Sequence, residues 1–331
     1  MDPPANHPIH DSGGFYFVMM FWLPPVFLVA LFLFPWLVNV VQPGSYQKIW
    51  LFFGVGSLDQ TFGDLRVILA GWEAIRDGLN PYLSNPTDPW ERLYNYPPIW
   101  LYGAATGFGQ EATNAIGTVF LALFLLTIGV LSKRLPRQFL PYWLLVLMSP
   151  PALLAMERGN IDLVVFSLVF LALPYSRLRF PAVALAACMK IFPLFALPMA
   201  RVGNRWKAAL VTLSAVMFYL LWEREKIALA LKATPTPIMY AFGGRVIFLR
   251  AGVVLHERFG IDISQTTVMA SFWLLLLIVS LGVAALAFRG KQEEQPDLYF
   301  LAGAGVFLGS FIFNANWNST FAVLRAQLPE A

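Results

Sequence analysis

Charged residues are scarce in this sequence, and their scarcity argues against a soluble fold. Only 13% of the 331 residues are Asp, Glu, Lys or Arg, whereas about 25% is usual for soluble domains. Hydrophobic residues make up 58% and aromatic residues 15% of the chain, more apolar surface than a soluble fold of this length can bury. The composition therefore predicts an all-α, polytopic integral membrane protein. The net charge of +4 is too small and too scattered to indicate binding of nucleic acid.

Cysteine and histidine are also scarce, which argues against the common metal sites. Cys188 is the single cysteine of the chain, so it has no internal disulfide and no cysteine-based metal site. The three histidines are too few for a histidine-rich site. We therefore expect neither a bound metal nor a cofactor. The first apolar run, 15–41, is too long for a signal peptide and has no basic segment ahead of it, so we expect a retained membrane anchor.

The apolar stretches have lengths typical of membrane helices. A helix needs about 20 apolar residues to cross the hydrocarbon layer. Several stretches reach or approach this length, some of them broken by proline: 15–41, 97–109, 113–132, 139–156, 161–175, 180–200, 208–222, 266–288 and 298–313. We expect about eight membrane helices (roughly seven to ten), including short or re-entrant ones. They form a single domain over 1–331.

Basic residues in the short links indicate which side of the membrane each link faces, because Lys and Arg favour cytoplasmic links. Four links carry them: 133–137, 177–179, 201–207 and 289–291. If all four are cytoplasmic, the stretch 180–200 enters and leaves on one side and is broken at Pro193. The long polar segment 42–97, the turn 157–162 and the Asn-rich C-terminal stretch then face outward.

Residues 64–77 have the pattern of an amphipathic helix within the outward segment 42–97. Apolar side chains recur at helical spacing on one face: Leu65, Ile68, Leu69, Trp72 and Ile75. Polar side chains lie on the opposite face: Arg66, Glu73 and Asp77. Gly78 is a natural helix stop. We expect this helix to lie along the membrane surface.

Asp64 stands in the first turn of this helix and has two possible roles. Aspartate commonly caps helix N-termini, which is a structural task. A carboxylate held at the lipid–water boundary could instead take a proton from a hydroxyl group. Asp59, in the preceding polar segment, is a second candidate for that chemistry or otherwise a solvated loop residue.

Two further polar features interrupt apolar helices. The turn 157–162 reads ERGNID, and it is either a solvated hairpin or a turn in which Arg158 and Asn160 line a polar cavity. Lys190 lies inside an apolar run, where a cation is costly and by default marks a functional site. It could otherwise extend to the interface. If it faces a cavity, it would suit a phosphate group at membrane depth.

In their order along the chain, these features resemble glycosyltransferase family 87, a family with the GT-C fold that includes polyprenyl-phosphate-mannose-dependent mannosyltransferases. Three motifs carry the resemblance: Asp64 ahead of the amphipathic helix, Gly78-Leu79-Asn80-Pro81-Tyr82, and Asn95-Tyr96-Pro97-Pro98. Two later motifs are similar to the family's Gly-x-x-Asn turn and Lys-x-x-Pro helix: Arg158-Gly159-Asn160 and Met189-Lys190-Ile191-Phe192-Pro193. The similarity extends over 15–315.

The resemblance implies an inverting transfer of a hexosyl group, of the mannosyl type, from a polyprenyl-phosphate donor to a hydroxyl of a lipid or glycan acceptor. Asp64 would be the general base, with Asp59 as the second candidate. The cations that balance the donor phosphate would be Lys190, Arg158, Arg245 and Arg250. The substrate-binding residues would be Asn80, Tyr82, Tyr96 and Asn160. The partners would be the lipid-linked donor, the acceptor and membrane lipids, in a bacterial plasma membrane with the active site facing outward and no metal required.

The C-terminal stretch departs from the family's pattern. The run 314–318 resembles the approach to an outer Asn/Asp-Tyr-Arg motif, but Ser319-Thr320 replaces the Tyr-Arg pair. We therefore expect a truncated or divergent C-terminal part. Two alternatives stay open. One is a transporter or lipid-linked sugar flippase, which broken helices and an intramembrane lysine also suit. The other is an inactive member of the family that acts as a scaffold.

Overall fold

The computed structural model is built of helices throughout the part of the chain that it describes, apart from one short strand pair. It describes residues 12–234, 241–242, 244–264, 266–268, 270–275, 277–278, 298–299, 301–303, 306 and 316–317. The first half contains α1 (Ser12–Val41), α2 (Tyr46–Phe52), α3 (Gly63–Arg76), η1 (Pro98–Thr106), η2 (Gln110–Ala112), α4 (Thr113–Ser132), η3 (Arg137–Phe139), α5 (Leu140–Leu147) and α6 (Pro150–Arg158), where η denotes a 3-10 helix. The second contains α7 (Asp162–Ala172), α8 (Arg179–Met189), η4 (Phe192–Arg201), α9 (Trp206–Trp222), α10 (Arg224–Ala233) and α11 (Gly244–Phe259). Strand β1 (Ala241–Phe242) pairs antiparallel with β2 (Asn316–Trp317).

Helices α1 and α4 are long and apolar enough to cross a membrane. Their apolar segments are Val18–Val41, with a mean hydropathy of 2.2, and Gln110–Ser132, with a mean hydropathy of 2.4. They confirm the helices predicted at 15–41 and 113–132. Within the described residues, the number of candidate crossings is 2, or up to 4 if each of two bent helix pairs counts as one span. The described chain is therefore all-α, with helices that could cross a membrane, which is consistent with its composition.

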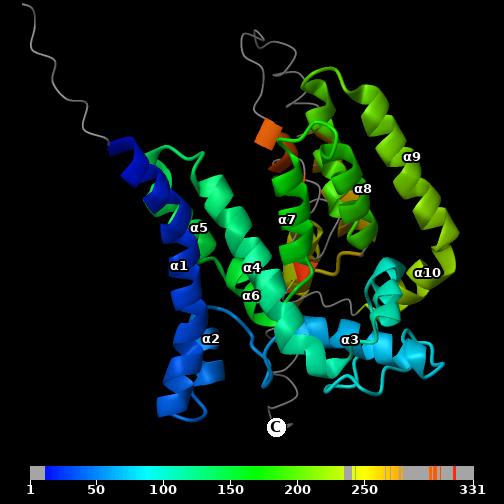
Figure 1. The fold of residues 1–331 in the computed structure, drawn as a ribbon. Helices are drawn as coiled ribbons and strands as arrows, with labels where there is room; N and C mark the ends of the chain where they lie inside the picture. The colour runs from blue at the N-terminus through cyan, green and yellow to red at the C-terminus, as the bar shows by residue number, and fades with distance from the viewer. Residues whose placement is uncertain are drawn as a thin grey trace, which may run out of the picture. The chain divides into compact units, whose positions relative to one another are not determined.

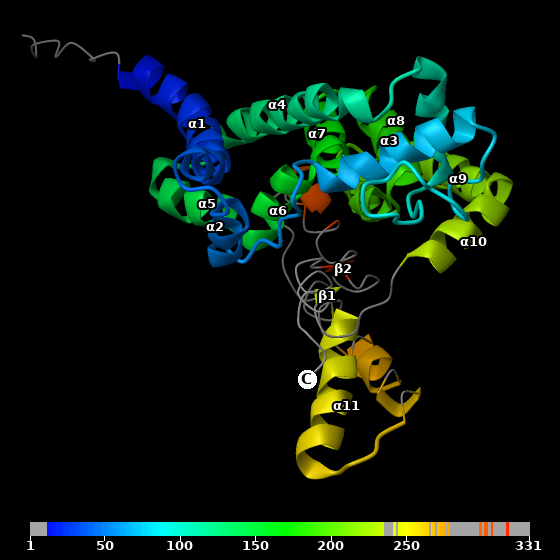
Figure 2. The same cartoon turned by 90° about the horizontal axis from the view of Figure 1, so that it is seen from below.

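Two other apolar stretches, 139–156 and 180–200, are broken near a proline, as the sequence predicts. α5 and α6 meet at an angle of 58° just before Pro150, which has no N–H to continue the helical hydrogen bonds. α8 ends at Met189 because Lys190 has an extended backbone, with φ −162° and ψ 127°. η4 begins two residues later, at Phe192. α9 bends by 76° into α10, a turn that can be followed in Figure 2.

The contacts divide the chain into two compact units, and each unit is made of two separate segments of the chain. Unit 1 comprises Met1–Phe62 and Ala115–Ser167, and unit 2 comprises Gly63–Asn114 and Leu168–Ala331. In unit 1, α2 lies against α1 (Figures 1 and 2). Side chains from α1, α2, α4, α5, α6 and the start of α7 share one buried core, which includes Leu28, Trp50, Ile128, Leu147, Leu153, Met156 and Leu163.

In unit 2, α3 packs along η1, and α8 packs against both α9 and η4 (Figure 1). η1 starts at Pro98 and ends at Gly107, whose left-handed φ of 78° suits a residue without a Cβ. The apolar stretch 97–109, which is short for a membrane span, thus contains a 3-10 helix that packs against α3.

Helix α3 confirms the helix predicted at 64–77, but its buried surface is wider than the amphipathic pattern indicates. The predicted apolar face is buried except at Ile75, which is 41% exposed. Residues beside that face are buried as well: Val67, Ala70, Gly71 and Ala74. Gly71 is covered by Tyr94 of the following loop and by Leu101 of η1. The protein itself therefore encloses much of α3, instead of leaving one whole side to solvent.

Three helices lie in stretches that sequence analysis leaves unassigned. α2 lies in the outward segment 42–97, and α10 and α11 lie in the mixed polar and apolar region between the stretches 208–222 and 266–288. Each mixes apolar and charged residues without a long apolar run, so composition alone does not indicate them. The spans predicted at 266–288 and 298–313, and the motif at 314–320, lie mostly outside the described residues.

Candidate functional site

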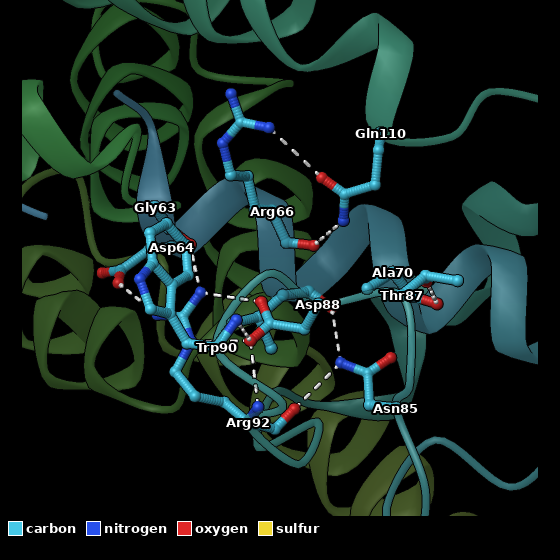
Figure 3. Close-up of polar contacts among 11 residues, drawn as sticks. Gly63, Asp64, Arg66, Ala70, Asn85, Thr87, Asp88, Trp90, Arg92 and Gln110 are labelled. Carbon is cyan, nitrogen blue, oxygen red and sulfur yellow. Dashed lines mark hydrogen bonds and ion pairs between the residues drawn. The ribbon is translucent and has the colours of Figure 1, made fainter. Parts of the chain in front are cut away.

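Asp64 lies in the first turn of α3, as predicted, and its side chain is 21% exposed. At this end of a helix the unpaired backbone N–H groups and the helix dipole stabilise negative charge. Arg92 supplies a cation close by, because its Nη1 lies 3.8 Å from Oδ1 of Asp64. The carboxylate is thus reachable from outside the fold and faces a guanidinium (Figure 3).

Arg92 reaches the start of α3 from the loop that follows this helix. Its Nη2 donates to the carbonyl oxygen of Gly63 at 2.6 Å and to Oδ1 of Asp88 at 2.8 Å. Its Nε donates to Oδ2 of Asp88 at 3.0 Å. The guanidinium carbon also lies 4.6 Å from the centre of the Trp90 ring. These contacts occupy one edge of the guanidinium and leave Nη1 on the side of Asp64.

Asp88 is the buried anchor of this arrangement. Its side chain has no exposed surface, and besides the guanidinium it accepts the backbone N–H of Trp90 at 3.2 Å and of Arg92 at 2.9 Å. A bidentate pair of this kind is the strongest Arg–carboxylate geometry. Asn85 donates to the carbonyl oxygens of Val67, at 3.4 Å, and Arg92, at 3.0 Å. The loop is therefore fastened to α3 on both sides of Asp88.

The tyrosines predicted to bind substrate belong to a packed aromatic cluster in unit 2. Tyr82 and Tyr94 are buried and meet edge to face, with ring centres 5.1 Å apart. The Tyr82 hydroxyl donates to the carbonyl oxygen of Tyr96 at 3.2 Å, and burial raises the pKa of the Tyr82 and Tyr94 phenols well above their usual range. Asn80 is exposed and accepts the N–H of Tyr82 at 3.1 Å, which closes the predicted turn. Tyr96, half-buried, is the more accessible tyrosine of the predicted pair.

Lys190 lies in the break between α8 and η4, half-buried, with its Nζ 5.7 Å from the centre of the Phe192 ring. Trp100 connects this break to η1, because its Nε1 donates to the carbonyl oxygen of Met189 at 3.4 Å. The carbonyl oxygen of Trp100 in turn accepts the indole N–H of Trp72 on α3. A chain of contacts within unit 2 thus joins the helix that carries Asp64 to the break that carries Lys190.

The polar turn 157–162 belongs to unit 1, and its first two charges are buried. Glu157 and Arg158 are 0% and 2% exposed, and Nε of Arg158 lies 3.3 Å from Oε2 of Glu157. Arg158 also donates to the carbonyl oxygen of Gly56. Glu157 accepts the hydroxyl of Tyr46 at 3.4 Å, and its carbonyl oxygen accepts the N–H of Phe62 at 2.9 Å. These charges hold segments of unit 1 together and do not form a solvated hairpin.

The remaining predicted residues belong to unit 1 or have side chains that the structure does not describe. Asp59 is an exposed residue of unit 1, and Asn160, also in unit 1, accepts the N–H of Asp162 at 2.9 Å and caps α7. Arg245 and Arg250 belong to α11, and their side chains lie outside the described residues. Among the residues that are described, no group of three or more His, Cys, Asp or Glu side chains is arranged to hold a metal ion.

Unit 2 therefore contains Asp64, Asn80, Tyr82, Tyr96 and Lys190, and it adds a pair that sequence analysis does not single out, Asp88 and Arg92. The only signal for that pair is a charged residue on each side of a Pro-Trp turn, in a loop with no periodic pattern. Comparisons with models of protein families, with curated proteins and with solved structures found no match.

Proposed function

We propose that this protein is a membrane glycosyltransferase that moves a hexosyl group, of the mannosyl type, from a polyprenyl-phosphate donor to a hydroxyl of a lipid or glycan acceptor. The observation that carries the proposal is the setting of Asp64, a partly exposed carboxylate in the first turn of α3, beside a guanidinium anchored by other groups. A GT-C arrangement of about eight membrane helices is part of the proposal. So is an active site on the outer face of a bacterial plasma membrane.

In the proposed reaction Asp64 is the general base. The acceptor oxygen attacks the anomeric carbon while the bond from that carbon to the phosphate oxygen breaks. The acceptor proton passes to the carboxylate, and the polyprenyl phosphate leaves with the bonding electron pair. The phosphate is a stable anion, so its departure needs no general acid, and a single displacement inverts the anomeric centre without a nucleophilic carboxylate.

Lys190 is the cation that we assign to the departing phosphate. A fixed positive charge stabilises the negative charge that develops on a leaving group. Lys190 lies in a helix break of the same unit as Asp64, and the Trp100–Met189 contact fastens that break to η1. Arg158 is a weaker choice because its guanidinium pairs with Glu157 inside unit 1.

A transporter or lipid-linked sugar flippase is the second candidate, and the helix breaks favour it. Substrate paths in transporters are often formed by discontinuous helices, and both the 58° bend between α5 and α6 and the break at Lys190 are of that kind. The two functions differ in their products. A flippase moves the lipid-linked sugar intact, whereas a transferase cleaves the bond between sugar and phosphate.

Purified protein in lipid vesicles, offered a panel of polyprenyl-phosphate sugars and acceptor lipids, tests the proposal by the release of polyprenyl phosphate. We expect Asp64→Asn to lower transfer by about 10²-fold or more, because general-base catalysis contributes that much, with membrane insertion unchanged. Asp77→Asn is the matched control, since Asp77 is an exposed carboxylate just after the same helix. We expect Lys190→Ala to raise KM for the donor more than KM for the acceptor.

Each result has a defined meaning. Transfer by Asp64→Asn at the wild-type rate would remove Asp64 from the role of base. Equal effects of Lys190→Ala on donor and acceptor would make this lysine a structural residue. Movement of intact lipid-linked sugar across the vesicle membrane, without release of polyprenyl phosphate from any donor, would show that the protein is a flippase and not a transferase.

A further inference from the structure

We propose that Arg92 is the positioning residue for Asp64, and that Asp88 holds Arg92 in place. The inference rests on the proposed function, because it gives Arg92 a role in the transfer for which Asp64 is the base. Its evidence is separate, however. It comes from the contacts of Asp88 and Arg92, two residues that belong to none of the motifs from which the function is inferred.

The contacts of Arg92 are divided between two tasks. Nε and Nη2 are engaged by the buried carboxylate of Asp88 and by the carbonyl oxygen of Gly63, at distances between 2.6 and 3.0 Å. Nη1 lies 3.8 Å from Oδ1 of Asp64. The guanidinium is planar and rigid. Anchoring one edge therefore fixes the position of the other edge beside Asp64.

The anchor also fixes where α3 begins. Gly63 is the first residue of α3, and its carbonyl oxygen accepts a hydrogen bond from Arg92 one residue before Asp64. A shift of Arg92 would thus move the backbone that carries the carboxylate and remove the charge that faces it. Asp88 makes such a shift costly, because its fully buried side chain would lose its cation.

The same geometry argues against a role for Arg92 as the ligand of the donor phosphate. In an inverting displacement the attacking oxygen and the leaving group lie on opposite faces of the sugar ring. A residue against the general base is therefore on the acceptor side of the ring. Arg92 lies against Asp64, whereas the departing phosphate needs a cation on the other side.

Arg92 also differs from an arginine that merely closes a loop. Its side chain is 30% exposed and that of Asp64 is 21% exposed, so an acceptor can approach the carboxylate while Arg92 stays bound to Asp88. Arg66 provides the comparison on the same helix. Its Nη1 is 3.5 Å from the side-chain oxygen of Gln110, and its carbonyl oxygen accepts from that amide at 2.7 Å. Arg66 thus holds η2 through Gln110.

Removal of Arg92 should lower kcat with little change in KM. A displacement of a reacting group by about 1 Å can lower the rate by about 10²-fold, and we expect a loss of this size for Arg92→Ala. Guanidinium ion added to the assay should restore part of the lost rate. The kcat of Arg92→Lys should lie between that of Arg92→Ala and that of the wild type. A single ammonium group cannot bond Asp88 and Gly63 and still face Asp64. Arg66→Ala should transfer at the wild-type rate.

The decisive experiment compares Asp64→Asn with the double variant Asp64→Asn/Arg92→Ala in the vesicle assay. If Arg92 acts through Asp64, both variants have the same residual rate, because the second change removes nothing further. A further tenfold loss in the double variant would overturn the proposal, as would wild-type kcat in folded Arg92→Ala. Should Arg92→Ala melt below the assay temperature, the result for Arg92→Lys decides, and wild-type kcat there would overturn the proposal. Failure of the proposed function looks different, because the wild-type protein would then release no polyprenyl phosphate from any donor, or Asp64→Asn would transfer at the wild-type rate.

Discussion

The packing of α3 on η1 gives a sharp test of the scaffold that carries Asp64. Gly103 of η1 faces the Trp72 ring of α3, and a Cβ added at Gly103 would overlap the six-membered part of that ring. Trp72 is 8% exposed, and its Nε1 donates to the carbonyl oxygen of Trp100. The ring can therefore move aside only if it gives up a hydrogen bond and a buried position.

These two effects set the size of the expected change for Gly103→Ala. Overpacking a well-packed site costs about 1–3 kcal/mol, and loss of the indole hydrogen bond adds about 1 kcal/mol. Alanine offsets about 0.4–1 kcal/mol of this loss, because it makes the unfolded chain less flexible than glycine does. We expect the free energy of unfolding to fall by about 2 kcal/mol. For a chain of 331 residues that lowers Tm by about 3 °C, which thermal melting in detergent, followed by tryptophan fluorescence, can measure.

Two comparisons identify the cause of that change. Gly303→Ala is the matched control, because its added Cβ would lie 3.7 Å from Cζ of Phe170, an ordinary contact distance. Trp72→Phe removes the ring atoms nearest Gly103, so Gly103→Ala should cost less in that background than alone, by about 1–2 kcal/mol. An unchanged Tm for Gly103→Ala would refute the close contact of α3 with η1. So would a double variant whose loss of unfolding free energy equals the sum of the losses for Gly103→Ala and Trp72→Phe.

Three further predictions concern unit 1. Glu157→Gln should lower the free energy of unfolding by about 3–5 kcal/mol, because it removes the charge that faces buried Arg158; Tm measures this. Burial raises the pKa of Tyr46 well above its usual range. The native state therefore retains a proton that the unfolded chain loses above a pH of about 10, and stability should fall as pH rises, less steeply in Tyr46→Phe. Phe62→Ala should cost about 3–5 kcal/mol, because the ring of Phe62 is buried and stacks on Phe32 with centres 6.0 Å apart.

Each of these predictions has a matched control and a result that contradicts it. Glu225→Gln changes an exposed carboxylate of α10 and should leave Tm unaltered; a similar Tm for both variants would show that Glu157 is not needed to neutralise Arg158. An identical loss of stability between pH 9 and 11 in wild type and Tyr46→Phe would exclude Tyr46 as a source of the pH dependence. Phe52→Ala removes a ring that is 84% exposed, and a loss equal to that of Phe62→Ala would contradict the packing of Phe62.

Part of the candidate site could be predicted from local sequence. Asp64 stands directly ahead of an apolar pattern with helical spacing, so its place in the first turn of α3 follows from residues within one or two turns. The break at Lys190 has a similar origin, since a charged residue and Pro193 interrupt an apolar run. Neither signal depends on how distant parts of the chain meet.

The surroundings of Asp64 could not be predicted in the same way. Asp88 and Arg92 lie in a loop without periodicity, and only the return of that loop along α3 brings Arg92 to Gly63. The sequence pattern likewise assigns Ile75 to the buried face of α3, but in the structure Ile75 is 41% exposed and Ala74 is buried.

Local sequence is enough to assign this chain to the all-α class, with helices at 15–41 and 113–132 that are long and apolar enough to cross a membrane and with breaks near prolines. These properties depend on how apolar each stretch is, and neighbouring residues set that. Which charges meet depends instead on the tertiary fold. It buries Glu157 against Arg158 and sets Arg92 between Asp88 and Asp64. Burial of a charge is costly unless a group of opposite charge lies beside it. That partner comes from elsewhere in the fold, and the local sequence pattern does not indicate which residue it is.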